Sequence, residues 1–371
     1  MRKLLFSATL FVIITFFFAG CSNDDSLKIP QDVEVKDFVW KGLNLYYLWQ
    51  ADSPDLQDDR FSTQNQLNNF LRNYSSPEAL FGHLTVDASI DRFSVITSDY
   101  MQLEAVLGGT ERTSGVDYQL FRKTPGSDDI FGFVRYILPN TDASTKPIAR
   151  GDIFYAVNGT PLTVQNQSGL LGADSFNLNM ANYDGGTITP NGISISLTKA
   201  NYSENPIYLT NTIDVGDKKV GYLMYNAFTA SFDGQLNQTF GQFQAAGITH
   251  LVVDLRYNSG GSVTTATRLA SMITGQFTSQ IFAQQQWNQK VMDFFNENNP
   301  EQIINRFTNS LGNGAAINSL NLQKVYFITS NRSASASELL IHNLKPYVDV
   351  TVVGNTTTGK NVGSIVLYDS P

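Results

Sequence analysis

Residues Lys324 to Lys360 read K-V-Y-F-I-T-S-N-R-S-A-S-A-S-E-L-L-I-H-N-L-K-P-Y-V-D-V-T-V-V-G-N-T-T-T-G-K, and the order of apolar and polar segments in this region indicates the fold class. The short apolar run V-Y-F-I-T predicts a buried strand. After a Ser-rich turn, E-L-L-I-H-N-L-K-P-Y predicts a helix and V-T-V-V a second strand, followed by a glycine turn. A strand, a helix and another strand in this order are the repeating unit of an α/β layer.

Earlier apolar runs extend this pattern. Val220 to Met224 and Leu251 to Leu255 have the length of buried strands, and helical stretches separate them. Together with Val325 to Thr329 and Val350 to Val353, they predict an α/β domain over residues 213–371, with a mixed sheet and flanking helices.

Two regions of different character precede this domain. Apolar residues such as Leu43 and Leu67 recur at helical spacing within residues 33–105, which predicts a small helical region. Residues 110–212 instead alternate in short segments bounded by Gly, Pro, Asn and Asp, which predicts a mostly β module. Residues 21–32 are interpreted as a linker.

Ser335 lies where the predicted strand hands over to the predicted helix. At such a corner a side chain is presented at the sheet edge, and the free N–H groups of the first helical turn can stabilise a developing oxyanion. Glu338 follows at the capping-box interval, which favours a helix start. By itself, the pattern favours an ordinary Ser-rich N-cap.

A wider set of residues resembles the C-terminal processing (tail-specific) serine peptidases. The run S-A-S-A-S-E at 333–338 is similar to that family's nucleophile segment, whose middle serine is here Ser335. The family's lysine base follows 25 residues later, which is Lys360 of G-K in this chain. The resemblance implies a Ser-Lys serine endopeptidase with a ClpP/crotonase-like catalytic domain.

A second block carries the same resemblance. D-L-R-Y-N-S-G-G at 254–261 is similar to the family's D-L-R-x-N-x-G-G turn, which lends a backbone N–H to the oxyanion hole. The resemblance implies Gly260 or Gly261 as one donor and Ala336 as the other. Which glycine serves stays open.

The chemistry places a demand on Lys360. A lysine can remove a serine proton only as a neutral amine, so its pKa must fall from about 10.4 to about 7. That fall corresponds to about 4 kcal/mol of disfavoured charge, which burial can supply. The sequence neighbours Thr356 to Gly359, Asn361 and Val362 carry no charge that would hold the lysine protonated. The alternative is a surface lysine in a glycine turn.

The chain departs from the family at two points. A glutamine usually follows the lysine by four residues and orients it, whereas here that position is Ser364, whose hydroxyl could still accept from the amine. Family members also continue with further strands after the lysine turn, so we expect this chain to be a fragment or a natural truncation.

The middle module resembles a PDZ domain. The segment G-D-I-F-Y-A-V-N-G at 151–159 is similar to the PDZ pattern, and its N-G pair predicts a hairpin turn. The resemblance implies capture of an extended peptide by strand addition, with the terminal carboxylate held by backbone amides near Ser114, Gly115 and Val116. The alternative is a β module that only packs on the α/β domain.

Composition and charge exclude other classes. The chain has 371 residues, enough for two or three domains, with 42% hydrophobic and 16% charged residues, a globular balance. The net charge of −8 provides no basic field for a phosphate backbone, so nucleic acid is not an expected partner.

The N-terminus predicts export. Residues 1–20 combine Arg2 and Lys3, an apolar run and a small-residue pair, the three parts of a secretory signal. F-A-G-C ending at Cys21 resembles a lipobox, which implies a lipid anchor in the cell envelope, with S-N-D-D after it favouring the outer membrane. An ordinary cleaved signal with a stray thiol is the alternative. The single cysteine excludes an internal disulfide.

Two rival catalytic interpretations fit less well. G-x-x-x-x-G-K from Gly354 matches a phosphate-binding loop, but Asn361 stands where Ser or Thr would hold magnesium, and the following residues look extended rather than helical. For a Ser-His-Asp triad, His342 would lie about 10 Å along the helix from Ser335. His83 and His250 are predicted to be structural, and no H-E-x-x-H or cysteine set predicts a zinc site.

We therefore predict a serine endopeptidase that needs no cofactor and cleaves exported polypeptides gripped near their C-termini. The competing hypothesis is a noncatalytic peptide-binding lipoprotein of the same fold. Natural substrate, cleavage preference and oligomeric state have no signal in the sequence.

Overall fold

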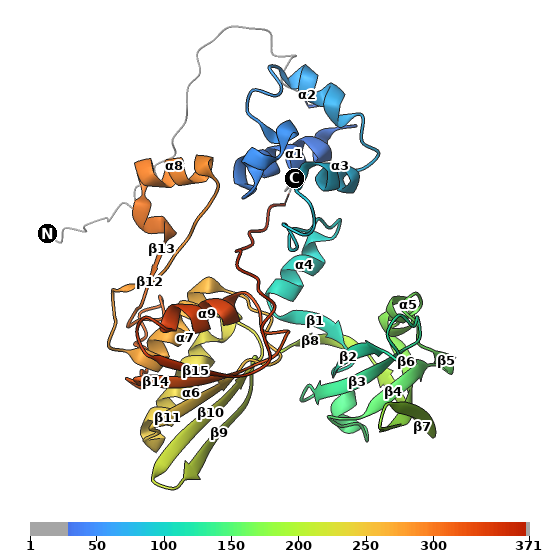
Figure 1. The fold of residues 1–371 in the computed structure, drawn as a ribbon, viewed down its shortest axis with the longest axis vertical. Helices are drawn as coiled ribbons and strands as arrows, with labels where there is room; N and C mark the ends of the chain where they lie inside the picture. The colour runs from blue at the N-terminus through green and yellow to red at the C-terminus, as the bar shows by residue number, and fades with distance from the viewer. Residues whose placement is uncertain (1–28, 369–371) are drawn as a thin grey trace, which may run out of the picture. The chain divides into compact units, whose positions relative to one another are not determined.

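The computed structural model describes residues 29–368, so the expected signal segment and Cys21 lie outside the described part. The chain divides into two compact units that meet in the sequence between Asp91 and Arg92. The first contains the described residues 29–91 and the second residues 92–368 (Figure 1).

The first unit is helical. Its elements are α1 (Glu34–Tyr46), η2 (Gln50–Asp52), η3 (Pro54–Leu56), α2 (Gln64–Leu71) and α3 (Pro77–Leu84). Hydroxyl side chains begin two helices, because Thr63 accepts from the N–H of Gln66 (3.3 Å) and Ser76 from that of Ala79 (3.2 Å). The core consists of fully buried leucines, Leu56, Leu71, Leu80 and Leu84. Helices are present where residues 33–105 were expected to be helical, although this unit ends at Asp91.

The second unit begins with one helix and a β module. These elements are α4 (Tyr100–Leu107), β1 (Thr110–Thr113), β2 (Val116–Arg122), β3 (Ile130–Ile137), η4 (Ala143–Thr145), β4 (Ile153–Val157), β5 (Thr160–Pro161), α5 (Gln167–Gly172), β6 (Ser175–Asp184), β7 (Thr187–Thr198) and β8 (Ala200–Ser203). Antiparallel strands form a sheet in the order β2-β3-β4-β6-β7, with β5 paired to β4. Asn158 and Gly159, with φ of 52° and 79°, form the tight turn that the N-G pair predicts.

The chain enters and leaves this module through a two-stranded ribbon. Strand β1 pairs antiparallel with β8, with Thr110 opposite Ser203. The module therefore behaves as an insertion between α4 and the sheet that follows it. The main sheet of the module has two edge strands: β2, which pairs only with β3, and β7, which pairs only with β6.

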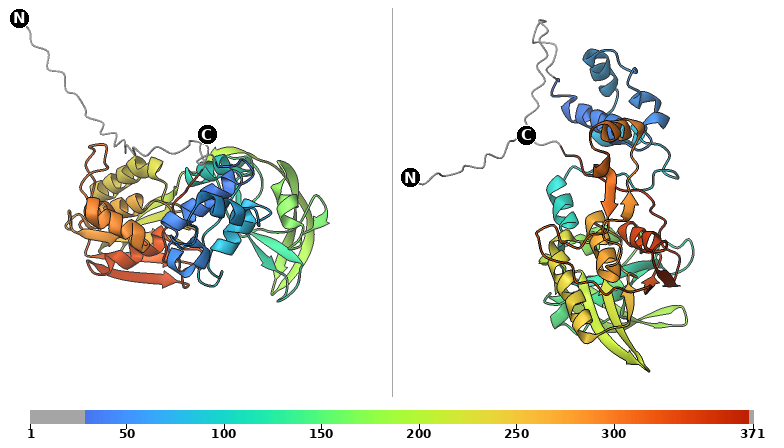
Figure 2. Two further views of the ribbon diagram at one scale, coloured as in Figure 1. Left: turned by 90° about the horizontal axis from the view of Figure 1, so that it is seen from above. Right: turned by 90° about the vertical axis from the view of Figure 1, so that its left-hand side faces the viewer.

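The α/β domain follows the module. Its sheet contains β9 (Ile207–Val215), β10 (Lys218–Tyr225), β11 (His250–Asp254), β14 (Lys324–Thr329) and β15 (Asp349–Gly354), in the order β15-β14-β11-β10-β9. Only β9 runs antiparallel to its neighbour, and the β9–β10 pair projects as a long hairpin (Figure 2). The sheet begins at Ile207, so β9 includes residues that the sequence placed in the module.

Helices cover one face of this sheet. They are α6 (Asp233–Ala246), α7 (Val263–Thr274) and α9 (Ala336–Leu344). Burial alternates along β14, where Val325 and Phe327 are fully buried and Tyr326 and Ile328 are only half-buried. The buried residues pack with apolar residues of all three helices into one core. An amphipathic sheet buries its apolar face in this way.

The remaining elements form an excursion between α7 and β14, with one short turn before α6. They are η5 (Ala230–Phe232), β12 (Ile281–Gln284), α8 (Gln289–Asn298), η6 (Pro300–Ile303) and β13 (Ile304–Arg306).

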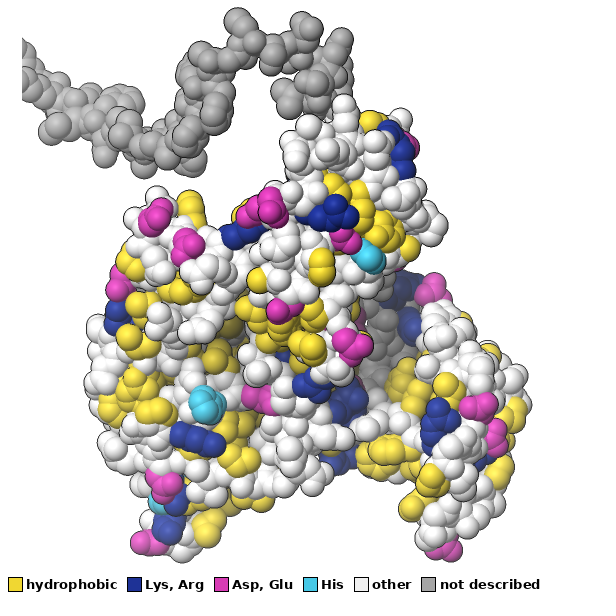
Figure 3. All heavy atoms as spheres, turned by 45° about the horizontal axis from the view of Figure 1, so that its top comes forward, with side chains coloured by type: hydrophobic (Ala, Val, Ile, Leu, Met, Phe, Trp, Pro, Cys, Tyr) yellow, Lys and Arg dark blue, Asp and Glu magenta, His cyan; other side chains and the backbone are white. Residues whose placement is uncertain are grey.

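Among residues 29–368, no helix has the length and apolar character needed to cross a membrane. Lys and Arg side chains lie scattered among Asp and Glu on the face drawn in Figure 3.

The parallel strands determine where a site can form. Because β10, β11, β14 and β15 run in the same direction, their carboxyl ends meet at one edge of the sheet. The turns that leave this edge contain residues 226–229, 255–261, 330–335 and 355–360. Segments far apart in the sequence therefore converge at this edge.

Candidate active site

Ser335 lies in the turn from β14 to α9, where it is the N-cap of the helix. Its backbone has φ 54° and ψ −115°, a region that residues with a Cβ rarely adopt. Such strain costs about 1–3 kcal/mol and persists only where the surrounding structure holds it. A sharp strand-to-helix turn of this kind exposes a serine hydroxyl at the sheet edge.

The serines two residues before and two residues after Ser335 anchor this strand-to-helix turn, the elbow (residues 330–335). Ser333 Oγ donates to the carbonyl of Leu255 at 2.7 Å, and Ser337 Oγ donates to the carbonyl of Asn258 at 3.1 Å. Both serines are fully buried, whereas Ser335 between them is half-buried. The S-A-S-A-S pattern thus separates two structural hydroxyls from one that is presented.

Gly260 lies directly against the elbow. A Cβ on this residue would fall 2.7 Å from Ser335 Cβ and 3.0 Å from the Ala336 nitrogen, so only glycine allows the approach. Its own N–H already donates to Asn258 Oδ1 at 2.8 Å. Gly260 therefore contributes close packing rather than a free amide.

Gly261 and Ala336 retain free amides. Within residues 29–368 neither N–H has a hydrogen-bond partner. The backbone of Phe228 lies beside Gly261, but its N–H donates to the Gly260 carbonyl (2.9 Å) and its carbonyl accepts from the Ser262 N–H (2.8 Å). Ala336 opens α9, and first-turn amides have no acceptor within their helix. Of the two glycines that the sequence could not separate, Gly261 is the one with an unused donor.

Glu338 joins the elbow to the turn at residues 355–360 that contains Lys360, the lysine turn. Its carboxylate accepts from the N–H groups of Ser335 (2.8 Å), Gly359 (2.7 Å) and Lys360 (2.9 Å). Burial raises the pKa of this carboxyl, but hydrogen bonds from the Thr357 side chain and these amides outweigh it and bring the pKa below its usual value. Sequence reasoning treated Glu338 only as a helix-capping residue.

The lysine turn also binds the nucleophile turn directly. The Thr358 N–H donates to the Ser333 carbonyl at 3.0 Å, and Thr358 Oγ1 donates to the Asn331 carbonyl at 2.9 Å. From a distant part of the chain, Arg92 Nη2 donates to the Gly359 carbonyl at 2.7 Å. The backbone beside Lys360 is therefore held from three sides.

Lys360 is half-buried. Its Nζ donates to Ser364 Oγ at 3.1 Å and lies 5.2 Å from the ring centroid of Phe93. Burial lowers the pKa of Lys360. Among the described residues Nζ makes no hydrogen bond to Ser335 Oγ, so the structure brings the two turns together without joining the two side chains.

A buried ion pair shapes the turn that contains the glycines. The Asp254 side chain is fully buried and accepts from Arg256 Nε (2.9 and 3.0 Å), from the Arg256 backbone N–H (3.1 Å) and from the Tyr222 hydroxyl (2.7 Å). Burial, followed by this carboxylate, raises the pKa of Tyr222 to about 12. The D-L-R segment thus holds the start of the 255–261 turn.

Tyr257, in the same turn, contacts the β module. The guanidinium groups of Arg135, Arg150 and Arg256 lie 5.4, 5.5 and 5.8 Å from its ring centroid. The ring of Tyr136 lies 5.3 Å away, and Arg150 donates to the Tyr257 hydroxyl. The sequence offered no signal for this contact, because its partners come from separate segments.

Ser114, Gly115 and Val116 lie at the start of edge strand β2. Gly115 has φ 94°, and a Cβ there would fall 1.8 Å from Thr141 Oγ1. Its N–H donates to Thr113 Oγ1 (3.1 Å), and Ser114 and Val116 are buried. This segment is a tight turn whose glycine amide is used internally.

The three histidines lie in different elements. His83 lies in α3 and contacts Asp55 at 2.8 Å, His250 begins β11, and His342 lies in the last turn of α9. Across residues 29–368, no group of three or more His, Cys, Asp or Glu side chains could hold a metal ion.

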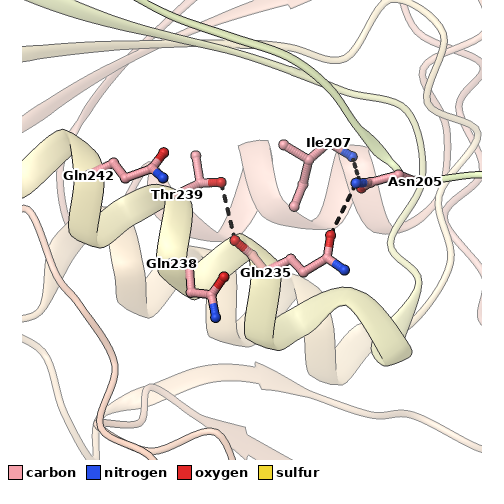
Figure 4. Close-up of a pocket in the computed structure, with 6 residues that line it drawn as sticks. All are labelled: Asn205, Ile207, Gln235, Gln238, Thr239 and Gln242. Carbon is pink, nitrogen blue, oxygen red and sulfur yellow. Dashed lines mark hydrogen bonds between the residues drawn. The ribbon is translucent and has the colours of Figure 1, made fainter. Parts of the chain in front are cut away.

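A surface pocket of about 430 Å³ lies between α6 and the start of β9 (Figure 4). Its lining is mostly polar, and Asn205 Nδ2 donates to Gln235 Oε1 at 3.0 Å across it. The lining residues are Asn205, Ile207, Gln235, Gln238, Thr239 and Gln242. None of them belongs to the elbow, the glycine turn or the lysine turn.

Comparison with known proteins gives concordant matches. The model of peptidase family S41 matches residues 219–367, and that of the peptidase S41 N-terminal domain matches residues 34–95. A Staphylococcus epidermidis protein described as a CtpA-like serine protease is 24% identical over 158 residues, which cover 40% of this chain and 28% of that protein. The match thus spans less than a third of the curated relative's length.

A solved structure extends the similarity. The crystal structure of a Bacteroides fragilis protein described as an S41 protease has a TM-score of 0.63 and 25% identity, covering 88% of this chain and 79% of that one. The fold and site define an α/β protein whose strained elbow serine lies at the carboxyl edge of its sheet. The chain belongs to peptidase family S41, the C-terminal processing peptidases that its sequence resembles.

Proposed function

We propose that this chain is a serine endopeptidase in which Ser335 is the nucleophile and Lys360 the general base. The observation that carries the proposal is the strained backbone of Ser335, with Gly260 packed against its Cβ. Ser335 also caps α9 in a capping box with Glu338, but N-cap residues ordinarily have β-region backbone, so capping alone does not require a positive φ. The backbone strain at Ser335 is explained if this conformation presents the hydroxyl to a substrate.

Acylation would proceed in two steps, formation of a tetrahedral intermediate and its collapse to an ester. The neutral Lys360 amine takes the Ser335 hydroxyl proton while Oγ bonds to the scissile carbonyl carbon, and the carbonyl electron pair moves to its oxygen. The N–H groups of Gly261 and Ala336 would stabilise that oxyanion. Collapse expels the amine, which takes the proton from Lys360, and leaves an ester that water hydrolyses.

The lysine must reach the serine for this chemistry. In the described conformation Nζ bonds to Ser364, which replaces the family's orienting glutamine. Lysine has a flexible four-carbon stem, and catalytic hydrogen bonds often form only when substrate is bound. We infer that side-chain rotation carries Nζ from Ser364 to Ser335.

The β module would supply substrate capture. We infer that it is PDZ-like and that an extended polypeptide adds to the free edge of β2, near Ser114, Gly115 and Val116, with its C-terminus at this end. The Gly115 amide is already bonded, so other amides would have to hold the carboxylate. Weaker binding of a peptide amide than of the free acid supports this inference, and equal binding contradicts it.

The N-terminus would supply the address. We infer export and a lipid anchor at Cys21, which places the peptidase in the cell envelope, at the outer membrane. Loss of detergent-phase partitioning on Cys21→Ser is the expected result, and unchanged partitioning contradicts the anchor.

A fluorophosphonate probe tests the proposed function, because such probes phosphonylate only activated serines. We expect the full chain to gain one adduct, located on Ser335 by mass spectrometry. Ser75→Ala removes an exposed serine of the helical N-terminal unit and should label like the wild type. Absence of labelling in a folded chain would favour the noncatalytic peptide-binding alternative, to which the missing Lys360–Ser335 hydrogen bond lends weight.

Glu338→Gln should weaken both catalysis and folding. An amide cannot accept from Ser335, Gly359 and Lys360 as a carboxylate does, so we expect a loss of roughly 10²-fold in kcat/KM and of about 1 kcal/mol in unfolding free energy. Because folding lowers this pKa, the stabilisation is present above pH 4.5 and disappears as pH falls through the folded pKa.

Urea unfolding at pH 7 and near pH 3 checks the linkage, since the difference between wild type and variant should shrink at the lower pH. Glu297→Gln, on exposed α8, is the matched control and should change neither quantity. An undiminished difference at low pH would show that the carboxylate is not the source of the effect.

A further inference from the structure

The segment just before α4 contacts the lysine turn from a great distance in sequence. Arg92 and Gly359, which share a hydrogen bond, are 267 residues apart. Phe93, the next residue, places its ring 5.2 Å from Lys360 Nζ. The Arg92 guanidinium lies 4.7 Å from the same ring, so Phe93 is an aromatic surface beside two cationic side chains.

The general base faces opposite demands at the beginning and end of proton transfer. Before acylation the Lys360 amine must be neutral, and burial favours that form. After it accepts the Ser335 proton, the same burial disfavours the ammonium. An aromatic ring attracts the ammonium less strongly than a carboxylate would, so it offsets part of the burial cost of the ammonium without holding the resting amine protonated.

The charged groups around Lys360 do not provide that stabilisation. Glu338 accepts from the backbone N–H of Lys360 and not from Nζ, and Arg92 carries a positive charge. Ser364 is a neutral acceptor. The ring of Phe93 is the remaining electron-rich surface near Nζ among the described contacts, and the face of an aromatic ring attracts a cation.

We propose that Phe93 is a positioning residue for Lys360, with its ring face keeping the amine beside the elbow and stabilising the ammonium that forms when Ser335 loses its proton. This inference rests on the proposed Ser335–Lys360 chemistry. It assigns a role in the reaction to a residue outside the family's nucleophile, base and glycine-turn segments.

The test separates the ring's electrostatics from its bulk. The readout is the second-order rate of fluorophosphonate labelling of the full chain from about pH 6 to about pH 11, which should rise as Lys360 loses its proton. Trifluorophenylalanine placed at position 93 keeps the ring's shape and removes most of its attraction for cations. The midpoint should then move to lower pH, and the plateau rate should fall by about twofold to thirtyfold.

Phe93→Ala should move the midpoint in the opposite direction. It removes the ring and also admits water, and recovered hydration of the ammonium raises the pKa of Lys360. Phe93→Tyr keeps the ring face and should leave the midpoint unchanged. Trifluorophenylalanine at exposed Phe294 is the matched control and should also change nothing.

Each outcome bears on the inference. A fluorinated ring that leaves both midpoint and plateau at wild-type values, or that lowers only the plateau, would mean that Phe93 merely packs against Lys360. If Phe93→Ala fails to fold, the shape-preserving fluorinated variant still decides. A wild-type chain that does not label refutes the proposed function and the inference together, whereas labelling with an unmoved midpoint refutes only the inference.

Discussion

Replacement of Ser335 by alanine should lower kcat/KM for an unfolded polypeptide by about 10⁴-fold or more, because no other group can form the ester intermediate. Folding should survive, since the anchoring bonds of the elbow come from Ser333 and Ser337. Cleavage of an unstructured protein, followed by gel electrophoresis, is the measurement. Ser75→Ala, at an exposed position of the helical N-terminal unit, should retain wild-type turnover. Unchanged turnover by Ser335→Ala would refute the assignment.

The strain at the same residue yields a second readout. Glycine adopts φ 54° without strain, whereas alanine does not. The free energy of unfolding of Ser335→Gly should therefore be about 1 kcal/mol higher than that of Ser335→Ala, although both variants should be inactive. Urea midpoints of the two variants measure this difference. Greater stability of the alanine variant would mean that the elbow is not strained.

Lys360→Met should reduce turnover by about 10³-fold, within the range expected for loss of a general base. Methionine keeps much of the buried stem and removes the amine, so stability should change little. Lys360→Arg should be equally inactive, because a guanidinium remains protonated at all accessible pH.

In the wild type, activity should rise with pH as Lys360 deprotonates, with a midpoint below the ordinary lysine value of 10.5 because burial lowers its pKa.

Chemical rescue provides the sharpest control for Lys360. Lys360→Cys followed by aminoethylation rebuilds an amine of nearly the same length, and the only other cysteine is Cys21. Partial recovery is expected in a Cys21→Ser background. Near-wild-type activity in Lys360→Met would instead mean that another group takes the serine proton.

The elements were largely predictable because their signals are local. Runs such as Val325 to Thr329 have the length and β-branched composition of buried strands, and they occupy β14 and its neighbours. The N-G pair at 158–159 forms the expected turn for the same reason. The start of the α/β sheet was less predictable, because β9 is an exposed edge strand whose apolar residues mark no buried face.

The site was predictable only in part. Motif spacing identified Ser335 and Lys360 as candidates and narrowed the oxyanion donors to two glycines. Only the structure showed that the Gly260 amide is used by Asn258. Glu338 was visible as a capping residue, but its bonds to Gly359 and Lys360 depend on how two turns meet in space.

The strand and helix pattern, the position of Ser335 at a strand-to-helix turn and the uncharged sequence neighbours of Lys360 could all be predicted, because each depends on residues close together in the chain. The distant groups that surround the two side chains follow only from the folded arrangement. Arg92 and Phe93 reach the lysine turn, and Tyr257 meets the β module, because parallel strands carry their carboxyl-end turns to one edge. Local sequence patterns encode the helices and strands, whereas contacts between distant segments depend on the order of the strands in the sheet.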